Sequence, residues 1–386
     1  MKSLILLTKI ILVAVVLSGL ISILGNFTAA SATTNHVSTG DTEKYRVYEG
    51  LAPTMENWES GMRTNPMPGT FEWWYLQGTF TDGSRTQIVY QTKPWMDNNG
   101  PLQPYIIISV QTPNGTLLQG QVKVDTDKFN AARNTLNVTM ANNWLDGDLN
   151  TIKLHVATTH NGIGADPVFT GAAPPTRFGG SGIWYFDQSL TRISAMNDAM
   201  PYAIVNGNLT YDGKPHPVQG TGYHDQQWGT VNWNQDYDGW YWSTGHYGNY
   251  TVDMFSFDMP TSSAFNNQQT QAFYLAKGNG PSKVLVETME GVTAHASGGN
   301  ITAPGGVHTY PKILTLQWKN GSDSANLTLT NPKILVAVSP VVNTNATIYG
   351  DPQYIRLSGT GTLNVNWAGS KETASAPAIW EVIYTH

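Results

Sequence analysis

The chain lacks cysteine entirely and carries few charged residues. The absence of cysteine from all 386 residues excludes disulfide bonds, thiol nucleophiles and cysteine-ligated metal sites. A chain of this length can bury enough apolar surface to fold without cross-links. Charged residues make up 12% of the sequence, about half the usual share of roughly 25%. Because the formal net charge is −6 and no basic run follows Lys9, we expect no nucleic-acid partner.

Several catalytic signatures are also missing. The sequence has no G-x-S-x-G motif, no H-E-x-x-H motif and no Walker-type loop. The acidic segments Asp125-Thr126-Asp127 and Asp236-Tyr237-Asp238 do not continue as calcium-binding loops. We therefore expect neither a cofactor nor an obligate metal.

Long hydrophobic runs are absent except at the N-terminus. Lys2 and Lys9 precede the apolar run Ile10–Leu24, and Ala30-Ser31-Ala32 matches a small-residue cleavage site. This pattern predicts that residues 1–32 form a signal peptide and that the exported chain begins near Thr33. The alternative, which the sequence leaves open, is an uncleaved N-terminus that associates the protein with a membrane.

What is abundant is glycine and aromatic residues, with 38 Gly, 13 Trp and 18 Tyr. This composition favours strands and tight turns. Many short alternating runs at spacings of about 8–12 residues predict an all-β protein built from sandwiches or barrels. The leading candidate for a helix is Ser189–Ala199, and residues 160–182 and 260–270 are predicted to be loops.

A repeated aromatic opening predicts two β domains in tandem. Gly239-Trp240-Tyr241-Trp242 resembles Glu72-Trp73-Trp74-Tyr75, and a hairpin-like segment follows each of them. The domain limits that we predict are a flexible lead-in at 33–67, an N-terminal β domain at 68–230 and a C-terminal β domain at 231–386.

The segment Gly220–Gly229 places an ionisable group among aromatic residues and glycines. If it is a strand, Tyr223 and Asp225 share one face and His224 points to the other, where a structural role is expected for it. A carboxyl group beside a phenol in aromatic surroundings suits proton transfer. The alternative is a structural Asp that accepts backbone hydrogen bonds in a loop.

Three segments together resemble the AttH-like, hydroxyneurosporene-synthase-type proteins. They are Glu72-Trp73-Trp74-Tyr75, the Gly-Tyr-x-Asp-x-x-Trp-Gly pattern of Gly222–Gly229, and Gly239-Trp240-Tyr241-Trp242. The superfamily includes carotenoid 1,2-hydratases and lipocalin-like Diels–Alderases. The resemblance implies two lipocalin-like antiparallel β-barrels with hydrophobic ligands bound in or between them, but it implies no single reaction.

The chain departs from this pattern beside Asp225. Gln226 stands where many relatives have His or Lys, and Gln227 where many have Asn, so the hydrogen bonds around Asp225 are expected to differ. Near the C-terminus, Trp380-Glu381 stands where the last strand of relatives often carries a Glu.

A hydratase needs a proton donor and a surface that tolerates a carbocation. We predict that Asp225 donates the proton, that Tyr223 holds or relays it, and that Trp rings stabilise the cation. The predicted ligand-binding residues are Glu72, Trp74, Trp184, Trp228, Trp242 and His246. For each of them a core or ion-pair role remains the alternative, because large aromatics in strands are usually core.

The leading functional hypothesis is an exported, monomeric, lipocalin-like protein that binds an extended hydrophobic molecule, such as a polyene, a terpenoid or a polyketide-like compound. It would catalyse hydration or cyclisation of this ligand. The alternatives are a non-catalytic lipid or pigment carrier, a cell-surface structural β protein, and a carbohydrate-binding module with exposed Trp platforms.

Overall fold

The computed structural model describes residues 38–39, 43–94, 96–159, 161–259, 269–278, 282–339 and 350–386. No helix in these segments is long and apolar enough to cross a membrane. The predicted signal peptide, residues 1–32, and most of the predicted loop 260–270 lie outside the described residues. Export and cleavage therefore stay predictions.

The first half of the chain forms a 13-stranded antiparallel sheet from the described residues. Its strand order is β5-β4-β3-β2-β13-β12-β10-β9-β8-β7-β6, and β11 pairs with both β12 and β1. The strands are β1 (Ser38–Thr39), β2 (Phe71–Phe80), β3 (Arg85–Gln91), β4 (Tyr105–Gln111), β5 (Leu117–Lys123), β6 (Phe129–Ala131), β7 (Leu136–Met140), β8 (Asn143–Gly147), β9 (Thr151–His155), β10 (Gly164–Gly171), β11 (Ile183–Tyr185), β12 (Ile193–Tyr211) and β13 (Lys214–Gly229).

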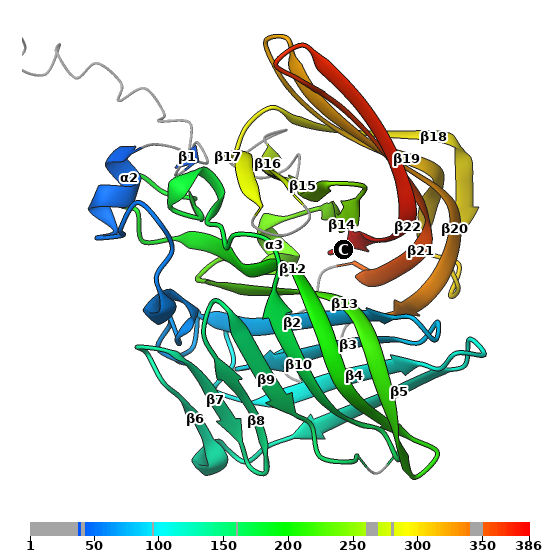
Figure 1. Cartoon of the computed structure of the whole chain (residues 1–386). Coiled ribbons are helices and arrows are strands. Elements are labelled where there is room, and N and C mark those ends of the chain that lie inside the picture. The colour runs from blue at the N-terminus through cyan, green and yellow to red at the C-terminus, as the bar shows by residue number, and fades with distance from the viewer. Residues whose placement is uncertain are drawn as a thin grey trace, which may run out of the picture. The chain divides into compact units, whose positions relative to one another are not determined.

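The second half forms a nine-stranded antiparallel sheet within the described segments, in the order β17-β16-β15-β14-β22-β21-β20-β19-β18. Its strands are β14 (Gly239–Tyr247), β15 (Tyr250–Asp258), β16 (Gln269–Lys277), β17 (Lys283–Thr288), β18 (Val292–Thr302), β19 (Thr309–Asn320), β20 (Asp323–Val338), β21 (Gln353–Trp367) and β22 (Ser370–Tyr384). Figure 1 shows that each sheet curls on itself.

The two sheets have similar topologies, although the first has more strands. In each one the first long strand, β2 or β14, pairs with the last strand, β13 or β22. The first sheet has its free edges at β5 and β6, which follow each other along the chain. The second sheet has its free edges at β17 and β18, which do the same. Each sheet is thus an up-and-down barrel with one unpaired seam, which confirms the prediction of an all-β fold with two β units in tandem.

The domain limits stay predictions, because residues 36–386 make up one compact unit by their contacts. The described part of the lead-in holds two short helices, α2 (Glu43–Tyr48) and η1 (Asn57–Ser60). Three more short helices lie between strands. They are η2 (Thr126–Lys128), η3 (Phe178–Gly180) and α3 (Trp233–Asp236).

Strand β2 buries both of its faces. Along β2, Trp74, Leu76 and Phe80 pack in the core of the first barrel, together with residues of β3, β4 and β12. The alternate residues Trp73 and Tyr75 belong to a second apolar cluster, which also contains Trp242 and Phe255 of the other sheet. A third cluster fills the barrel of the second sheet.

Tight turns form where the sequence predicts them. Asp82-Gly83 joins β2 to β3, and Asp212-Gly213 joins β12 to β13. Asp212 and Gly213 have φ values of 52° and 71°. Positive φ at both central residues is the geometry of a type I′ hairpin turn, which Asp-Gly tolerates well.

Two local predictions are wrong. The predicted helix Ser189–Ala199 is instead a turn followed by the start of β12, because Ile193–Ala195 pair with β11 and Ser194–Asn197 pair with β13. The predicted loop 160–182 contains strand β10, whose Ala165 and Phe169 are fully buried in the first core. Pairing on both sides overrides the local glycine and proline content.

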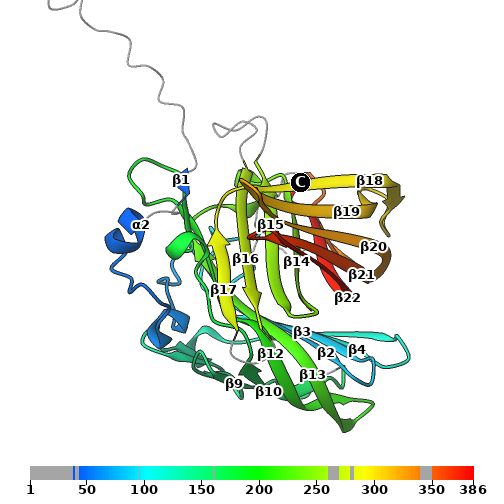
Figure 2. The same ribbon diagram turned by 45° about the horizontal axis from the view of Figure 1, so that its top comes forward.

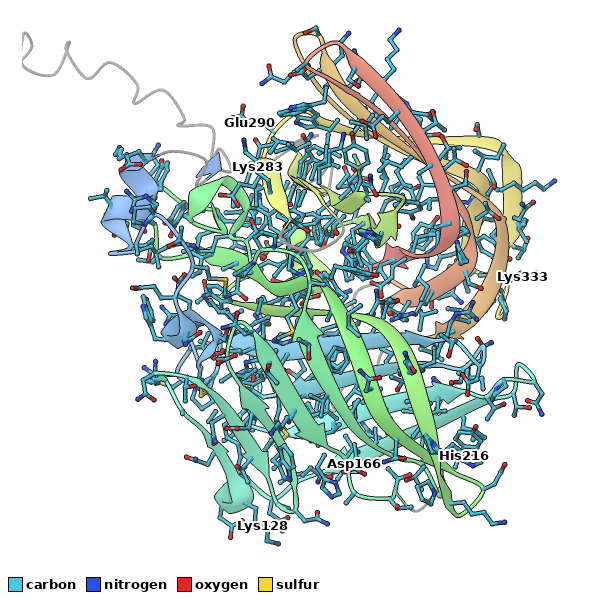
Figure 3. The ribbon with its side chains drawn as sticks, viewed as in Figure 1. Lys128, Asp166, His216, Lys283, Glu290 and Lys333 are labelled. Atoms are coloured by element: carbon cyan, nitrogen blue, oxygen red, sulfur yellow. The ribbon has the colours of Figure 1, made fainter. Side chains whose placement is uncertain are left out.

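Charged side chains lie mainly on the outside. Figure 3 labels Lys128, Asp166 and His216 around the first sheet and Lys283, Glu290 and Lys333 around the second. Five of these residues are exposed, and His216 is half-buried. Some of the buried ionisable groups line a cavity between the two sheets, described next.

Candidate functional site

A cavity of about 160 Å³ lies between residues of the two sheets. Its volume is comparable with that of apolar protein cavities that hold a benzene-sized molecule. The cavity lies outside both barrel cores, because the residues that line it alternate with core residues along each strand. Its aromatic and polar lining includes Trp73, Tyr75, Gln87, Gln91, Asp225, Gln227, Trp240, Trp242, Phe255, Phe257, Tyr354 and Glu381.

The motif segments meet at this cavity through strand pairing. In the β2–β13 ladder, Tyr75 lies opposite Asp225, and Trp73 lies opposite Gln227. In the β14–β22 ladder, Trp242 lies opposite Glu381. Since side chains alternate along a strand, these residues face the cavity while their neighbours face a barrel core.

Asp225 and Tyr223 share a face of β13, as the sequence predicts. Asp225 is 2% exposed and lines the cavity, where its Oδ1 accepts a 3.4 Å hydrogen bond from the Gln227 amide. Burial, reinforced by the charge of Asp253, raises the pKa of Asp225 well above its usual range. Asp225 is therefore suited to carry a proton near neutral pH.

Tyr223 lies behind Asp225 among aromatic rings. Its ring centroid is 5.4 Å from that of Trp242 and 6.2 Å from that of Tyr75. Its hydroxyl donates a 2.9 Å hydrogen bond to Oδ1 of Asp198 on β12. Burial raises the pKa of Tyr223 well above its usual value, so the phenol stays protonated.

Asp198 and Asp253 are buried carboxyl groups that sequence reasoning missed. Asp198 was assigned to a predicted helix, whereas Asp253 lies on β15 and is fully buried, like Asp198. Burial raises the pKa of both groups, and the charge of Asp253 raises that of Asp198 further. The signal that could have found Asp253 is its alternation with Phe255 and Phe257, which places it on their face of the strand.

A second polar cluster lies on the other side of the cavity, around Arg356 of β21. The Arg356 guanidinium donates hydrogen bonds to the Tyr75 hydroxyl and to Oε1 of Gln77, the latter at 2.5 Å. Its Nη1 lies 3.7 Å from Oε1 of Glu381. Arg356 is 3% exposed, so this cation depends on its protein partners.

Tyr354 completes the polar cluster. Its hydroxyl donates to Oε1 of Glu381 and accepts a 2.7 Å hydrogen bond from the Gln87 amide. Burial raises the pKa of Glu381, while Arg356 and the Tyr354 hydroxyl oppose this shift. The sequence singled out Glu381 only by its place in the last strand, and it did not single out Tyr354 or Arg356.

Of the six predicted ligand-binding residues, Trp242 lines the cavity, and the structure places the other tryptophans elsewhere. Trp74 is fully buried in the first barrel core, whereas its neighbour Trp73 lines the cavity. Trp184 packs against the Phe255 ring at 5.4 Å between centroids, behind the cavity wall. Trp228 belongs to a separate cluster with Ile183, Tyr185 and Ala195.

Glu72 has a structural environment. Its carboxylate accepts hydrogen bonds from the backbone N–H groups of Arg63 and Thr64, both at 2.8 Å, and from the Thr64 hydroxyl. It also accepts a 2.7 Å hydrogen bond from the amide of Gln226. Glu72 therefore ties the lead-in to β2 and β13.

The two histidines of interest lie away from the cavity. His246 stacks on Tyr202 at 4.3 Å between ring centroids, and its Nδ1 lies 3.0 Å from the Thr251 hydroxyl. His224 is fully buried, with Nδ1 at 2.9 Å from the Tyr75 carbonyl oxygen. Burial lowers the pKa of His224 to about 4, so this imidazole is neutral at physiological pH.

The described residues contain no group of three or more His, Asp or Glu side chains that could hold a metal ion. The two acidic segments considered from the sequence have other partners. Asp125 pairs with Lys128 at 2.7 Å, Asp236 with Arg192, and Asp238 with His386.

Comparison with known proteins finds similarity through structure alone. No protein-family profile and no curated protein sequence matches the chain. Among solved structures, a putative AttH from Nitrosomonas europaea is similar, with a TM-score of 0.60 and 15% identity over 86% of this chain and 99% of that one.

Two further solved structures are similar over 86% of this chain. Kievitone hydratase from Nectria haematococca has a TM-score of 0.55 and 16% identity, with 93% of its chain covered. CghA in complex with Sch210972 has a TM-score of 0.57 and 13% identity, with 96% covered. At these identities the likeness concerns the fold, and the chain has the tandem lipocalin-like β-barrel fold of AttH-like proteins, as the motif resemblance implied.

Proposed function

We propose that the cavity binds an apolar small molecule and that Asp225 and Glu381 catalyse the addition of water to one of its carbon–carbon double bonds. The observation that carries this proposal is an aromatic cavity wall that holds two carboxyl groups in different surroundings. Asp225 lies among Tyr and Trp rings, whereas Glu381 lies beside the Arg356 guanidinium. Surroundings that hold the pKa values of two such groups apart let one act as the acid and the other as the base.

Asp225 supplies the proton in the first step. Its O–H proton is transferred to one alkene carbon, the π electrons form the new C–H bond, and the neighbouring carbon becomes a carbocation. The rings of Trp73 and Trp242 line the same cavity. A cation over such a ring is stabilised by about 0.5–2 kcal/mol.

Water completes the reaction in the second step. An oxygen lone pair of water forms the C–O bond, and Glu381 accepts the proton that the water loses. Asp225 has lost one proton and Glu381 has gained one, so exchange with solvent restores the starting state. Arg356 and the Tyr354 hydroxyl keep Glu381 available as an acceptor by stabilising its ionised form.

The ligand class follows from the lining. The wall includes the rings of Trp73, Trp240, Trp242, Phe255 and Phe257. A cavity of about 160 Å³ holds a group the size of a benzene ring. We therefore infer that it binds the reacting part of an extended polyene, terpenoid or polyketide-like molecule. Among structures of this fold is one named kievitone hydratase, which supports hydration as the reaction class.

A non-catalytic carrier of lipid or pigment is the second candidate, because the same apolar wall would serve binding alone. We also propose that the protein is exported and monomeric. The apolar run Ile10–Leu24 and the cleavage pattern Ala30-Ser31-Ala32 support export.

The deciding experiment uses Asp225→Asn and Glu381→Gln. Binding of an apolar fluorescent probe is measured by quenching of tryptophan fluorescence, and turnover of isoprenoid polyenes by incorporation of heavy-oxygen-labelled water. Both variants should bind the probe as the wild type does, while turnover falls by about 10²–10⁴-fold. Exposed Asp127→Asn is the matched control and should change neither quantity.

The other outcomes separate the alternatives. A wild type that binds the probe but incorporates no labelled oxygen would be a carrier. Turnover that yields a cyclised product and survives Asp225→Asn would indicate a cyclase that works by positioning. A loss of about 1–3 kcal/mol of unfolding free energy in Asp225→Asn, with normal activity per folded molecule, would make Asp225 a structural acceptor.

A further inference from the structure

We propose that Asp198 and Asp253 share a proton behind the cavity wall and act, through Tyr223, as positioning residues that keep Asp225 a proton donor. This inference rests on the proposed role of Asp225 as the acid. It adds two residues that do not line the cavity.

The three aspartates come from three strands that pack together. Asp225 on β13 faces the cavity, whereas Asp198 on β12 and Asp253 on β15 do not line it. Strands β12 and β13 run side by side in both ribbon views (Figure 1 and Figure 2), and β15 packs against β12. The carboxyl pair thus joins one strand from each sheet.

An irregularity in β12 positions Asp198. The β12–β13 register shifts between Asn197 and Met200, and Asp198 lies within this bulge. Its backbone is held from the other side by two 2.9 Å hydrogen bonds with the backbone of Thr176. Bulges re-aim side chains next to functional sites, and here the Asp198 carboxyl group receives the Tyr223 hydroxyl.

The hydrogen bond from Tyr223 to Asp198 determines what Tyr223 offers to Asp225. Because the phenol proton is directed to Oδ1 of Asp198, at 2.9 Å, the phenol oxygen has only lone pairs to present elsewhere. Tyr223 and Asp225 share one face of β13, and a hydrogen bond donated by the Tyr223 hydroxyl lowers the pKa of Asp225. When the phenol proton is directed to Asp198 instead, Tyr223 does not favour ionisation of Asp225, which retains its proton more readily.

The carboxyl oxygens themselves indicate a shared proton. Within the described part of the chain, Oδ2 of Asp198 and both oxygens of Asp253 have no hydrogen-bond partner of good geometry. Two ionised carboxylates without such partners would be very unfavourable in a fully buried place. One proton held between Asp198 and Asp253 removes one charge and supplies the missing donor.

The other titratable groups around the pair leave this conclusion intact. Tyr223 on β13 and Tyr274 on β16 are the phenols beside it, and burial keeps both protonated. Glu381 on β22 acts on Asp225, and Glu287 on β17 acts on Tyr274. No Lys or Arg is among the main influences on the pKa of Asp198, Asp225 or Asp253 in the described segments.

The remaining negative charge has a consequence for Asp225. The charge of Asp253 raises the pKa of Asp225, in addition to the effect of burial. A pair that keeps one proton and one charge therefore helps Asp225 to retain its proton at higher pH. Removing the pair should let Asp225 ionise at lower pH.

The experiment labels aspartate carboxyl groups with carbon-13 and follows the protonated C=O stretch by infrared difference spectroscopy as the pH is raised. It compares the wild type, Asp225→Asn, the double variant Asp198→Asn/Asp253→Asn and the control Asp127→Asn. Asp225→Asn should keep part of the protonated signal at neutral pH, because the pair remains. In the double variant, the remaining Asp225 signal should titrate at a pH lower by about one unit or more.

Two results would overturn the inference. The first is a spectrum of Asp225→Asn without any protonated aspartate at neutral pH, which would mean that the pair holds no proton. The second is an Asp225 titration that stays unchanged in the double variant. If that variant does not fold, the comparison of wild type with Asp225→Asn still decides the first point, and the single variants Asp198→Asn and Asp253→Asn decide the second.

The readout also separates this inference from the proposed function. The infrared signals need no substrate, so they report the carboxyl pair even in a protein without turnover. A wild type that shows the pair but hydrates no polyene would contradict the proposed function alone. A hydratase whose pH limit is the same in the double variant would contradict the pair alone.

Discussion

Tyr75 and Asp225 lie directly opposite each other in the β2–β13 ladder. The aromatic motif near the start of the first barrel and the acidic motif near its end therefore form one wall of the cavity. Arg356 reaches this wall from the other sheet and donates to the Tyr75 hydroxyl. The acid, the aromatic surface and the buried cation are thus fixed relative to one another by strand pairing and by hydrogen bonds between the sheets.

Trp242 should matter for ligand affinity, and Trp184 should not. Trp242 lines the cavity, whereas Trp184 packs behind Phe255. Trp242→Phe should weaken binding of an apolar cationic probe by about 2–30-fold, the loss expected from a poorer cation–π surface of about 0.5–2 kcal/mol. Trp184→Phe is the matched control. Fluorescence titration of both variants checks this, and equal losses would place the ligand elsewhere.

Breaking the buried ion pair should cost more than removing it. Arg356→Met leaves Glu381 buried without its cation and should lower the free energy of unfolding by about 3–5 kcal/mol. The double variant Arg356→Met/Glu381→Met should be less destabilised than Arg356→Met alone, because no charge is left behind. Urea unfolding of the two single variants and the double variant measures this coupling, and simple additivity would argue against it.

Stability should fall as the pH rises from about 6.5 to about 8. Burial raises the pKa of Asp253 to about 7, from 3.8, so the folded chain binds more protons than the unfolded chain up to that pH. The free energy of unfolding then decreases with increasing pH, by up to about 1 kcal/mol per pH unit below pH 7 for this group and by little near pH 8. Urea unfolding at several pH values measures the slope, which Asp253→Asn should reduce.

His224 has the opposite effect at lower pH. Because burial lowers its pKa to about 4, from 6.5, the unfolded chain binds the extra proton between these values. Its contribution to stability is complete above pH 6.5 and is lost as the pH falls toward 4. The window from 6.5 to 8 therefore isolates the carboxyl groups, and a flat profile there would contradict the assignment.

Gly222 should not tolerate a side chain. A Cβ atom there would lie 2.5 Å from the Phe169 ring, 2.6 Å from a Val205 methyl group and 2.7 Å from the Gln77 carbonyl oxygen. Gly222→Ala should destabilise the fold by about 1–3 kcal/mol through overpacking. Gly115→Ala, which has open space around the new Cβ, should cost less despite its positive φ. Thermal unfolding of both variants tests the difference.

Local sequence signals predicted turns and faces well. Asp82-Gly83 and Asp212-Gly213 form the expected hairpin turns, and alternation placed Tyr223 and Asp225 on one face. The alternation of side chains could not show which of Trp73 and Trp74 faces the cavity, because nearly every residue of β2 is buried. When both faces of a strand are covered, the pattern of apolar residues no longer distinguishes a barrel core from a cavity wall.

The contacts around the cavity could not be predicted for a different reason. Arg356 and Tyr75 are separated by 281 positions in the sequence, and only the packing of the two sheets brings them together. The segment Ser189–Ala199, which contains Asp198, is predicted to be a helix, whereas the bulge that positions Asp198 is set by pairing with β13 and Thr176. Local preference cannot report a contact that depends on tertiary pairing.

The unpaired seams described for the two barrels have a dynamic consequence. Strands β5, β6, β17 and β18 each expose one row of backbone amides at a sheet edge, whereas β2, β13, β14 and β22 are hydrogen-bonded on both sides. Opening at the seams should therefore let edge amides exchange with solvent rapidly, without loosening the strands that carry Asp225, Tyr75, Trp242 and Glu381. The reacting groups should therefore keep their spacing while the edges of the barrels fluctuate.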